Sequence, residues 1–123
     1  MKRLLVRADD LGYSRGVNYG IYDSVHNGII NNVGLMVNMD DTEHGLTLLE
    51  HEDVALGLHV VISAGKPIIK SDGLSSITTE DGFFKSSKIY RSSKQDFVDL
   101  DEVVAEIEAQ YQKFLSLVGK KPD

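Results

Sequence analysis

The sequence predicts an α/β fold in which parallel strands are joined by helical crossovers. Apolar runs typical of buried strands lie at 3–8, 33–37 and 54–62, with helical patterns between them at 15–27 and 42–50. The composition is globular, with 41% hydrophobic and 26% charged residues. Because 123 residues suffice for one hydrophobic core, we expect the whole chain to form a single α/β domain.

Local patterns support the first elements. Ser14 is a suitable N-cap for the first helix, and Val17, Ile21 and Val25 follow at i, i+4 and i+8 as its apolar face. The third predicted strand is almost continuously apolar, which is typical of a strand covered on both faces. The order strand, helix, strand, helix, strand is typical of a parallel sheet.

The segment 63–96 interrupts this alternation. A loop of this length inside a domain is usually functional or disordered, and we expect a lid or a substrate-facing excursion. A short hairpin is expected around Glu80, Asp81 and Gly82. The segment is rich in Ser and Thr and in turn-forming residues, among them Gly65, Pro67, Gly73 and Gly82.

The last predicted element is a core helix over 99–118. Asp99 and Glu102 have the spacing of a capping box, and Gly119 provides the stop. We expect part of the apolar face of this helix to lack cover, and therefore expect self-association. That face comprises Leu100, Val103, Val104, Ile107, Tyr111, Phe114, Leu115 and Val118.

Composition excludes several classes of protein. The net charge of −6, with scattered Lys and Arg, gives no electrostatic support for nucleic-acid binding. The absence of cysteine excludes a disulfide framework and a thiolate metal site. No run approaches the roughly 20 apolar residues of a membrane span. We therefore expect a cytoplasmic protein that binds neither membranes nor nucleic acid.

Ionisable side chains follow two of the predicted strands. Asp9 and Asp10 come after the first strand and His59 lies in the third, so parallel topology brings them to one edge of the sheet and suggests a metal site. Asn38 ends the second strand, and Tyr13 follows the acid pair. Non-catalytic interpretations stay open. One of the two carboxylates caps a helix and the other is solvated, His59 is an ordinary strand-edge residue, and Asn38 only satisfies a turn.

Two other classes of function compete with an enzyme. A receiver domain also carries a magnesium-binding acid pair after its first strand, but it needs a phosphorylated aspartate after the third strand. Here no aspartate occurs from His59 through Gly65. The second alternative is a non-catalytic carbohydrate-binding half-domain in which these side chains are merely polar.

Residues 7–14, RADDLGYS, resemble the first motif of the YdjC-like carbohydrate deacetylases. Further stretches that resemble this family are 33–38, 56–60, 65–67 and 119–123. The resemblance implies a (β/α) barrel related to polysaccharide deacetylases. Because such a barrel takes about 250 residues, we expect residues 1–123 to be its N-terminal part.

The resemblance also implies a reaction, the hydrolysis of N-acetyl groups from amino-sugar oligosaccharides of the chito-oligosaccharide type. It implies a divalent metal ion, Mg²⁺ or Zn²⁺, with Asp10 and His59 as ligands and Asp9 as general base. Asn38 and Tyr13 would contact the oligosaccharide. In the family, a second histidine ligand and a general-acid histidine belong after position 123, so we expect weak or no activity from this chain alone and pairing with a C-terminal half.

Overall fold

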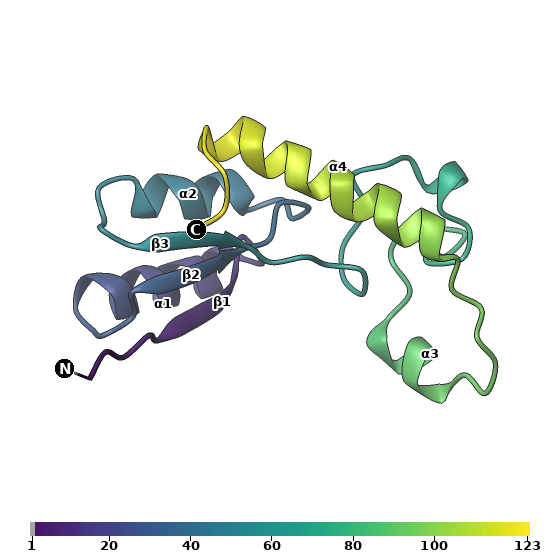
Figure 1. Cartoon of the computed structure of the whole chain (residues 1–123), viewed down its shortest axis with the longest axis horizontal. Helices are drawn as coiled ribbons and strands as arrows, with labels where there is room; N and C mark the ends of the chain where they lie inside the picture. The colour runs from purple at the N-terminus through teal and green to yellow at the C-terminus, as the bar shows by residue number, and fades with distance from the viewer. Residues whose placement is uncertain (1) are drawn as a thin grey trace.

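Three parallel strands form the sheet of the computed structural model, which describes residues 2–123 (Figure 1). They lie in the order β1-β2-β3, and the predicted α/β fold with helical crossovers is confirmed. The strands are β1 (Arg7–Leu11), β2 (Asn32–Leu35) and β3 (Ala55–Leu58). The crossover helices are α1 (Arg15–His26) and α2 (Thr42–Leu49).

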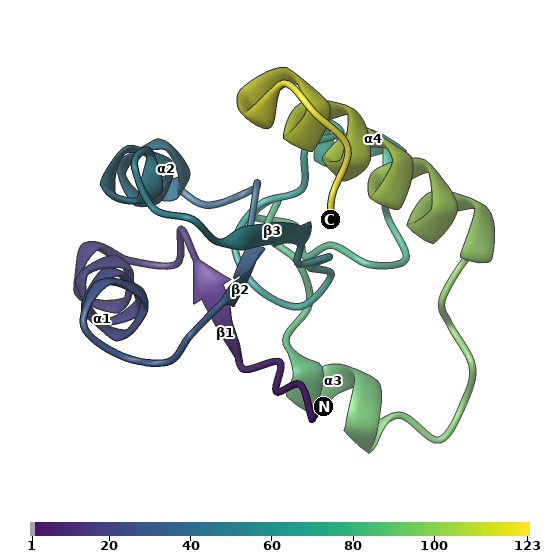
Figure 2. The same cartoon turned by 60° about the vertical axis from the view of Figure 1, so that its left-hand side comes forward.

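The main hydrophobic cluster lies between this sheet and its helices. Figure 2 shows α1 and α2 side by side on one face of the sheet. Val33 pairs with Leu56 and both are buried, as is Ile21 of α1. Val17 and Val25 pack against the same cluster, so the predicted face of the first helix is confirmed. Ser14 caps α1 as predicted, accepting a hydrogen bond from the amide of Val17.

The first strand begins later than predicted. Strand β1 spans Arg7–Leu11 rather than 3–8, because its partner strand begins at Asn32, which pairs with Arg7. Leu4 and Leu5 are more than 70% exposed, so the apolar run that predicted a strand there is not a buried one. The acid pair therefore lies inside the C-terminal half of the strand, not after it.

The other strands are shorter than predicted, since β2 ends at Leu35 and β3 at Leu58, which are partners in the sheet. His59 still donates its amide to the carbonyl of Leu35, at 2.8 Å. His59 consequently lies immediately beyond the carboxyl end of β3.

The segment 63–96 contains short elements and its own hydrophobic cluster. A 3₁₀ turn, η1 (Ser71–Gly73), and helix α3 (Ser87–Ser92) lie in it. The hairpin expected at Glu80–Gly82 is present: Thr78 pairs with Phe84 in an antiparallel bridge, and Gly82 adopts a positive φ of 78°. Leu74, Ile77 and Phe84 form the buried centre of this second cluster.

Helix α4 (Leu100–Val118) extends from the sheet along the segment 63–96 (Figure 1), and its side chains contribute to both clusters. Phe114 is fully buried in the first cluster and Val103 packs against the second. Part of the apolar face is uncovered as expected, with Leu100 73% and Val104 65% exposed. Within residues 2–123, no helix is both long and apolar enough to cross a membrane.

Candidate functional site

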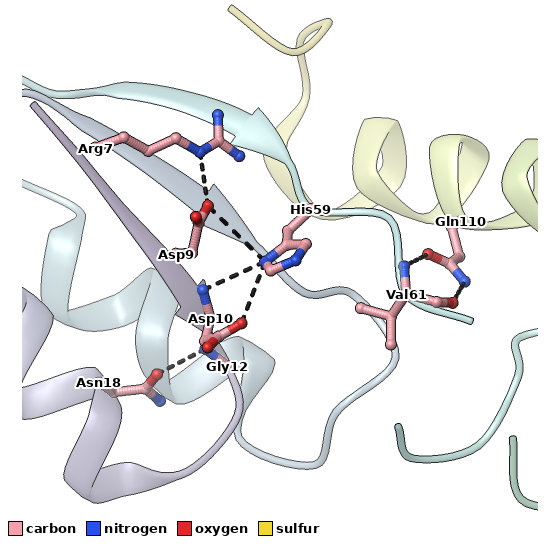
Figure 3. Close-up of polar contacts among 8 residues, drawn as sticks. All are labelled: Arg7, Asp9, Asp10, Gly12, Asn18, His59, Val61 and Gln110. Atoms are coloured by element: carbon pink, nitrogen blue, oxygen red, sulfur yellow. Dashed lines mark hydrogen bonds and ion pairs between the residues drawn. The ribbon is translucent and has the colours of Figure 1, made fainter. Parts of the chain in front are cut away.

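Asp9, Asp10 and His59 gather at the carboxyl ends of β1 and β3 (Figure 3). The Oδ1 atom of Asp10 lies 3.3 Å from Nδ1 of His59, and Oδ1 of Asp9 lies 4.0 Å from the same nitrogen. The site is open to solvent, with the two carboxylate side chains just over half exposed and the imidazole 31% exposed. The expected convergence of these side chains is therefore present in the structure.

The backbone of Asp10 explains how two neighbouring carboxylates reach the same imidazole. Successive side chains of a regular strand point to opposite faces of the sheet. Asp10 has a φ of 72°, in the left-handed region, and the register between β1 and β2 shifts between Ala8 and Leu11. This irregularity turns the Asp10 side chain toward His59. A non-glycine residue held in this conformation stores strain of the kind that gathers at functional sites.

The turn that follows Asp10 is fastened by a buried asparagine. Gly12 has a φ of 103°, and a Cβ atom there would lie 2.8 Å from the carbonyl oxygen of Met36. Fully buried Asn18 accepts the amide of Gly12 at 2.7 Å (Figure 3). It also donates to the carbonyl of Asp41 at 2.9 Å. Asn18 thus ties the turn after β1 to the start of α2.

Arg7 is a member of the site to which we assigned no role from the sequence. Its Nε donates to Oδ1 of Asp9 at 2.7 Å, and its Nη1 donates to Oδ1 of Asn32 at 3.1 Å. Arg7 and Asp9 are two residues apart on one strand, so they share a face of the sheet. That spacing was the available signal for the pair.

Helix α4 holds the chain just beyond His59, a connection that sequence reasoning also missed. Gln110 accepts the amide of Val61 at 3.0 Å and donates to its carbonyl at 2.6 Å (Figure 3). Gln110 also donates to the buried carboxylate of Glu106 at 2.8 Å. The sequence carries no clear signal for this connection, because helical periodicity places Glu106 and Gln110 outside the apolar face.

Asn38 and Tyr13 lie outside this cluster of contacts. The Asn38 amide donates to the carbonyls of Ala64 and Lys66 at 3.0 and 3.1 Å, so it fastens the start of the excursion. Its Oδ1 is buried and has no hydrogen-bond partner in the part of the chain that the structure describes. Tyr13 is 56% exposed, and none of the described contacts joins its ring to the acid pair.

The geometry of Asp10 and His59 suits a divalent cation. The Asp10 amide donates to Nδ1 of His59 across a long 3.4 Å, and a cation bound there would take over the single lone pair of that nitrogen, 3.3 Å from the carboxylate. A cation between two such acceptors relieves their repulsion. Ligand atoms bonded to one ion at about 2.1 Å each lie roughly 3.0–3.4 Å apart, which matches the separation of these two atoms.

The described residues supply only part of a coordination shell. Among residues 2–123, no three His, Asp or Glu side chains gather closely enough to hold an ion together. His26 instead pairs with Glu52 at 2.8 Å, and His44 lies 3.0 Å from the amide nitrogen of Asn18. The donors present therefore fit two positions around a divalent cation.

Comparison with known proteins places this chain in a family. The sequence profile of the YdjC-like proteins matches residues 3–123. A solved structure from Enterococcus faecalis V583, provisionally described as a cellobiose-phosphate cleavage protein, is similar with a TM-score of 0.86 and 25% identity. The match covers 97% of this chain and 45% of that one, so the chain spans less than half the length of that protein. Since the family profile matches nearly every residue, the chain belongs to the YdjC-like family.

Proposed function

We propose that this protein is a metal-dependent carbohydrate deacetylase, which removes N-acetyl groups from amino-sugar oligosaccharides of the chito-oligosaccharide type. The YdjC-like family is related to carbohydrate deacetylases and is generally metal-dependent. The observation that carries the proposal is the approach of Asp10 Oδ1 to His59 Nδ1 at 3.3 Å, beside a second carboxylate.

In this proposal the three side chains have different tasks. Asp10 and His59 hold Mg²⁺ or Zn²⁺, which when bound polarises the acetamide carbonyl and makes a nearby water more acidic. Asp9 accepts the proton from the attacking water. Its Oδ1 is engaged by Arg7, whereas its Oδ2 makes no hydrogen bond within residues 2–123 and is free for this purpose.

Other parts of the chain support substrate binding in the proposal. In this proposal Tyr13 contacts the sugar with its exposed ring. Asn38 contacts it together with the loop that the Asn38 amide holds in place. The excursion 63–96 contributes the rest of the surface that faces the oligosaccharide. In barrels of this type such loops set substrate specificity.

Metal binding and turnover together test the proposal, with the protein produced at its full natural length. Titration calorimetry with Zn²⁺ and Mg²⁺ should show a loss of affinity in Asp10→Asn and His59→Gln. Asp9→Asn should keep the affinity but slow acetate release from N-acetylated chito-oligosaccharides by at least about 100-fold, because a positioned base contributes about that much. His51→Gln, an exposed histidine outside the site, is the matched control.

The same assay separates the competing functions. Cellobiose phosphate has no acetamide, so cleavage of that compound without acetate release would point to the chemistry named for the Enterococcus protein. Sugar binding without any turnover would favour the non-catalytic carbohydrate-binding alternative. Acetate release that persists in Asp9→Asn would overturn the assignment of the base.

A further inference from the structure

We infer that Arg7 is a positioning residue that separates the roles of the two aspartates, holding Asp9 away from the cation so that Asp10 alone serves as the carboxylate ligand. The inference rests on the proposed function and deepens it. It begins from an asymmetry: Asp9 Oδ1 lies 4.0 Å from Nδ1 of His59 and Asp10 Oδ1 lies 3.3 Å from it, a difference of only 0.7 Å. With so small a difference in distance, a restraint on Asp9 can decide which carboxylate takes the ligand position.

The restraint on Asp9 is a short charge-assisted hydrogen bond. Arg7 Nε lies 2.7 Å from Oδ1 of Asp9, the same oxygen that faces His59. Hydrogen bonds between ionised partners are about twice as strong as neutral ones. Guanidinium keeps its charge at every working pH. The oxygen of Asp9 nearest to the imidazole is therefore already bound.

The guanidinium itself is fixed on its far side. Arg7 Nη1 donates to Oδ1 of Asn32 at 3.1 Å, and Asn32 is 8% exposed. Asn32 is the residue of β2 that pairs with Arg7 across the sheet. The guanidinium group is thus held between a buried amide oxygen and the carboxylate of Asp9, and Figure 3 shows its contact with Asp9.

Two glycines on neighbouring strands make room for this arrangement. Gly34 of β2 and Gly57 of β3 are partners in the sheet. A Cβ at Gly34 would lie 2.5 Å from Arg7 Nη2 and 2.8 Å from Asp9 Oδ1, and one at Gly57 would lie 3.3 Å from Arg7 Nη1. Glycine weakens a strand interior and often marks the close approach of another group. Here the group that approaches is the Arg7 side chain.

A double-mutant cycle with the metal alone tests the inference. In the protein with Arg7, Asp10→Asn should weaken Zn²⁺ binding by more than the roughly 10- to 100-fold that loss of an outer partner costs. In the Arg7→Met background, Asp9 is released and replaces the lost ligand. Asp10→Asn should then weaken Zn²⁺ binding by less than about 10-fold. A difference between the two backgrounds arises only when the two sites interact. Equal losses in the two backgrounds would overturn the inference.

Turnover provides a second readout. Arg7→Met should lower kcat for acetate release by roughly 10- to 100-fold and leave KM unchanged, because Asp9 moves toward the cation and no longer serves as base. Arg7→Lys, which keeps a positive charge beside Asp9, should recover part of kcat. A role confined to stability predicts instead an unchanged kcat for the folded fraction, and that result would contradict the inference.

The glycines give variants that keep every charge. Gly57→Ala displaces only the guanidinium, so it should reproduce the Arg7→Met pattern in weaker form and have no further effect once Arg7 is Met. Gly20→Ala is the matched control, since a Cβ there meets nothing within 4 Å. If the unmodified protein binds neither Mg²⁺ nor Zn²⁺, the proposed function fails. If it binds the metal but Arg7 leaves the cost of Asp10→Asn unchanged, this inference alone fails.

Discussion

In the parallel sheet the strands satisfy one another's backbone groups, whereas in the segment that follows β3 side chains of α4 satisfy several of them. Glu106 accepts the amides of Ile68 and Ile69 at 2.9 and 3.0 Å, and Gln110 binds both backbone groups of Val61. Glu102 accepts the amide of Ser76 at 2.8 Å. These three polar residues recur every four positions and therefore form one stripe along the helix. Their side chains bond backbone groups of the neighbouring segment, as the backbone of an adjacent strand would.

The comparison explains how an irregular segment can carry a hydrophobic cluster of its own. Leu74, Ile77 and Phe84 are at most 5% exposed although no regular sheet surrounds them. Burial of a loop leaves backbone amides without water, which is costly unless another group accepts them. The stripe on α4 meets that need. The sheet depends chiefly on apolar burial and the excursion depends on polar side chains, and the following substitutions separate the two.

The largest effect is expected at the sheet. Phe114→Ala removes a fully buried ring from the main cluster and should lower the free energy of unfolding by about 3–5 kcal/mol. Urea titration followed by circular dichroism measures it. The control is Phe83→Ala, because that ring is 46% exposed and its loss should cost less than about 1 kcal/mol. Similar losses in the two variants would show that burial in the sheet cluster is not what decides stability.

A smaller and more local effect is expected in the excursion. Glu106→Ala leaves the amides of Ile68 and Ile69 without acceptors and should cost about 2–4 kcal/mol. Hydrogen exchange should accelerate at those two amides while the amides of β2 keep their protection. Glu108→Ala, which loses only a surface contact with Gln112, is the control. Uniform acceleration along the whole chain would mean that the two regions open together.

Loss of a helix N-cap in either region should lower the free energy of unfolding by about 1 kcal/mol. Asp99 accepts the amide of Asp101 at 2.9 Å at the start of α4, and Ser14 accepts that of Val17 at 3.3 Å in α1. Asp99→Ala should destabilise more than Ser14→Ala, since its bond is shorter and its charge favours a helix N-terminus. Asp99→Asn, which keeps the cap and removes the charge, should fall between wild type and Asp99→Ala. The reverse order in thermal unfolding would contradict this ranking.

The smallest effect is a pH dependence confined to the excursion. The hydrogen bond from the Ser76 hydroxyl, together with other bonds from Ser76 and Ser75, holds the pKa of Glu102 below its ordinary value of 4.5. A carboxyl with a lowered pKa in the folded state contributes stability that is present above pH 4.5 and is lost as the pH falls below that value. Glu102→Gln should reduce the dependence of the unfolding free energy on pH below pH 4.5. A slope identical to that of wild type would remove Glu102 as its source.

The sequence predicted the order of strands and helices because those signals are local, whereas it misplaced the first strand, whose bounds depend on pairing with β2. The spacing of Val17, Ile21 and Val25 and the cap at Ser14 depend on residues within a few turns of one another. Helix α4 was found for the same reason, but its buried face was only partly recognised. Periodicity treats Glu106 and Gln110 as solvent-facing, although both are fully buried, and their burial depends on loop amides distant in sequence.

The candidate site likewise contains residues that the sequence predicted and one that it did not. Asp9, Asp10 and His59 meet as expected because the carboxyl ends of parallel strands share one edge. Arg7 was missed because its position depends on Gly34 and Gly57, which single-strand patterns do not connect. The catalytic, ligand and substrate-binding roles stay predictions, as do cytoplasmic location, self-association and the choice of metal.

The positive φ of Asp10 also governs how variants at this position should be interpreted. Alanine removes the carboxylate and also the short polar side chain that helps Asp and Asn tolerate a left-handed conformation, which costs other L residues about 1–2 kcal/mol, so an alanine scan mixes two defects. Asparagine and glycine tolerate the backbone. A saturation library selected for folding alone should therefore enrich glycine and asparagine at position 10 over valine and isoleucine, and one selected for metal retention should return aspartate.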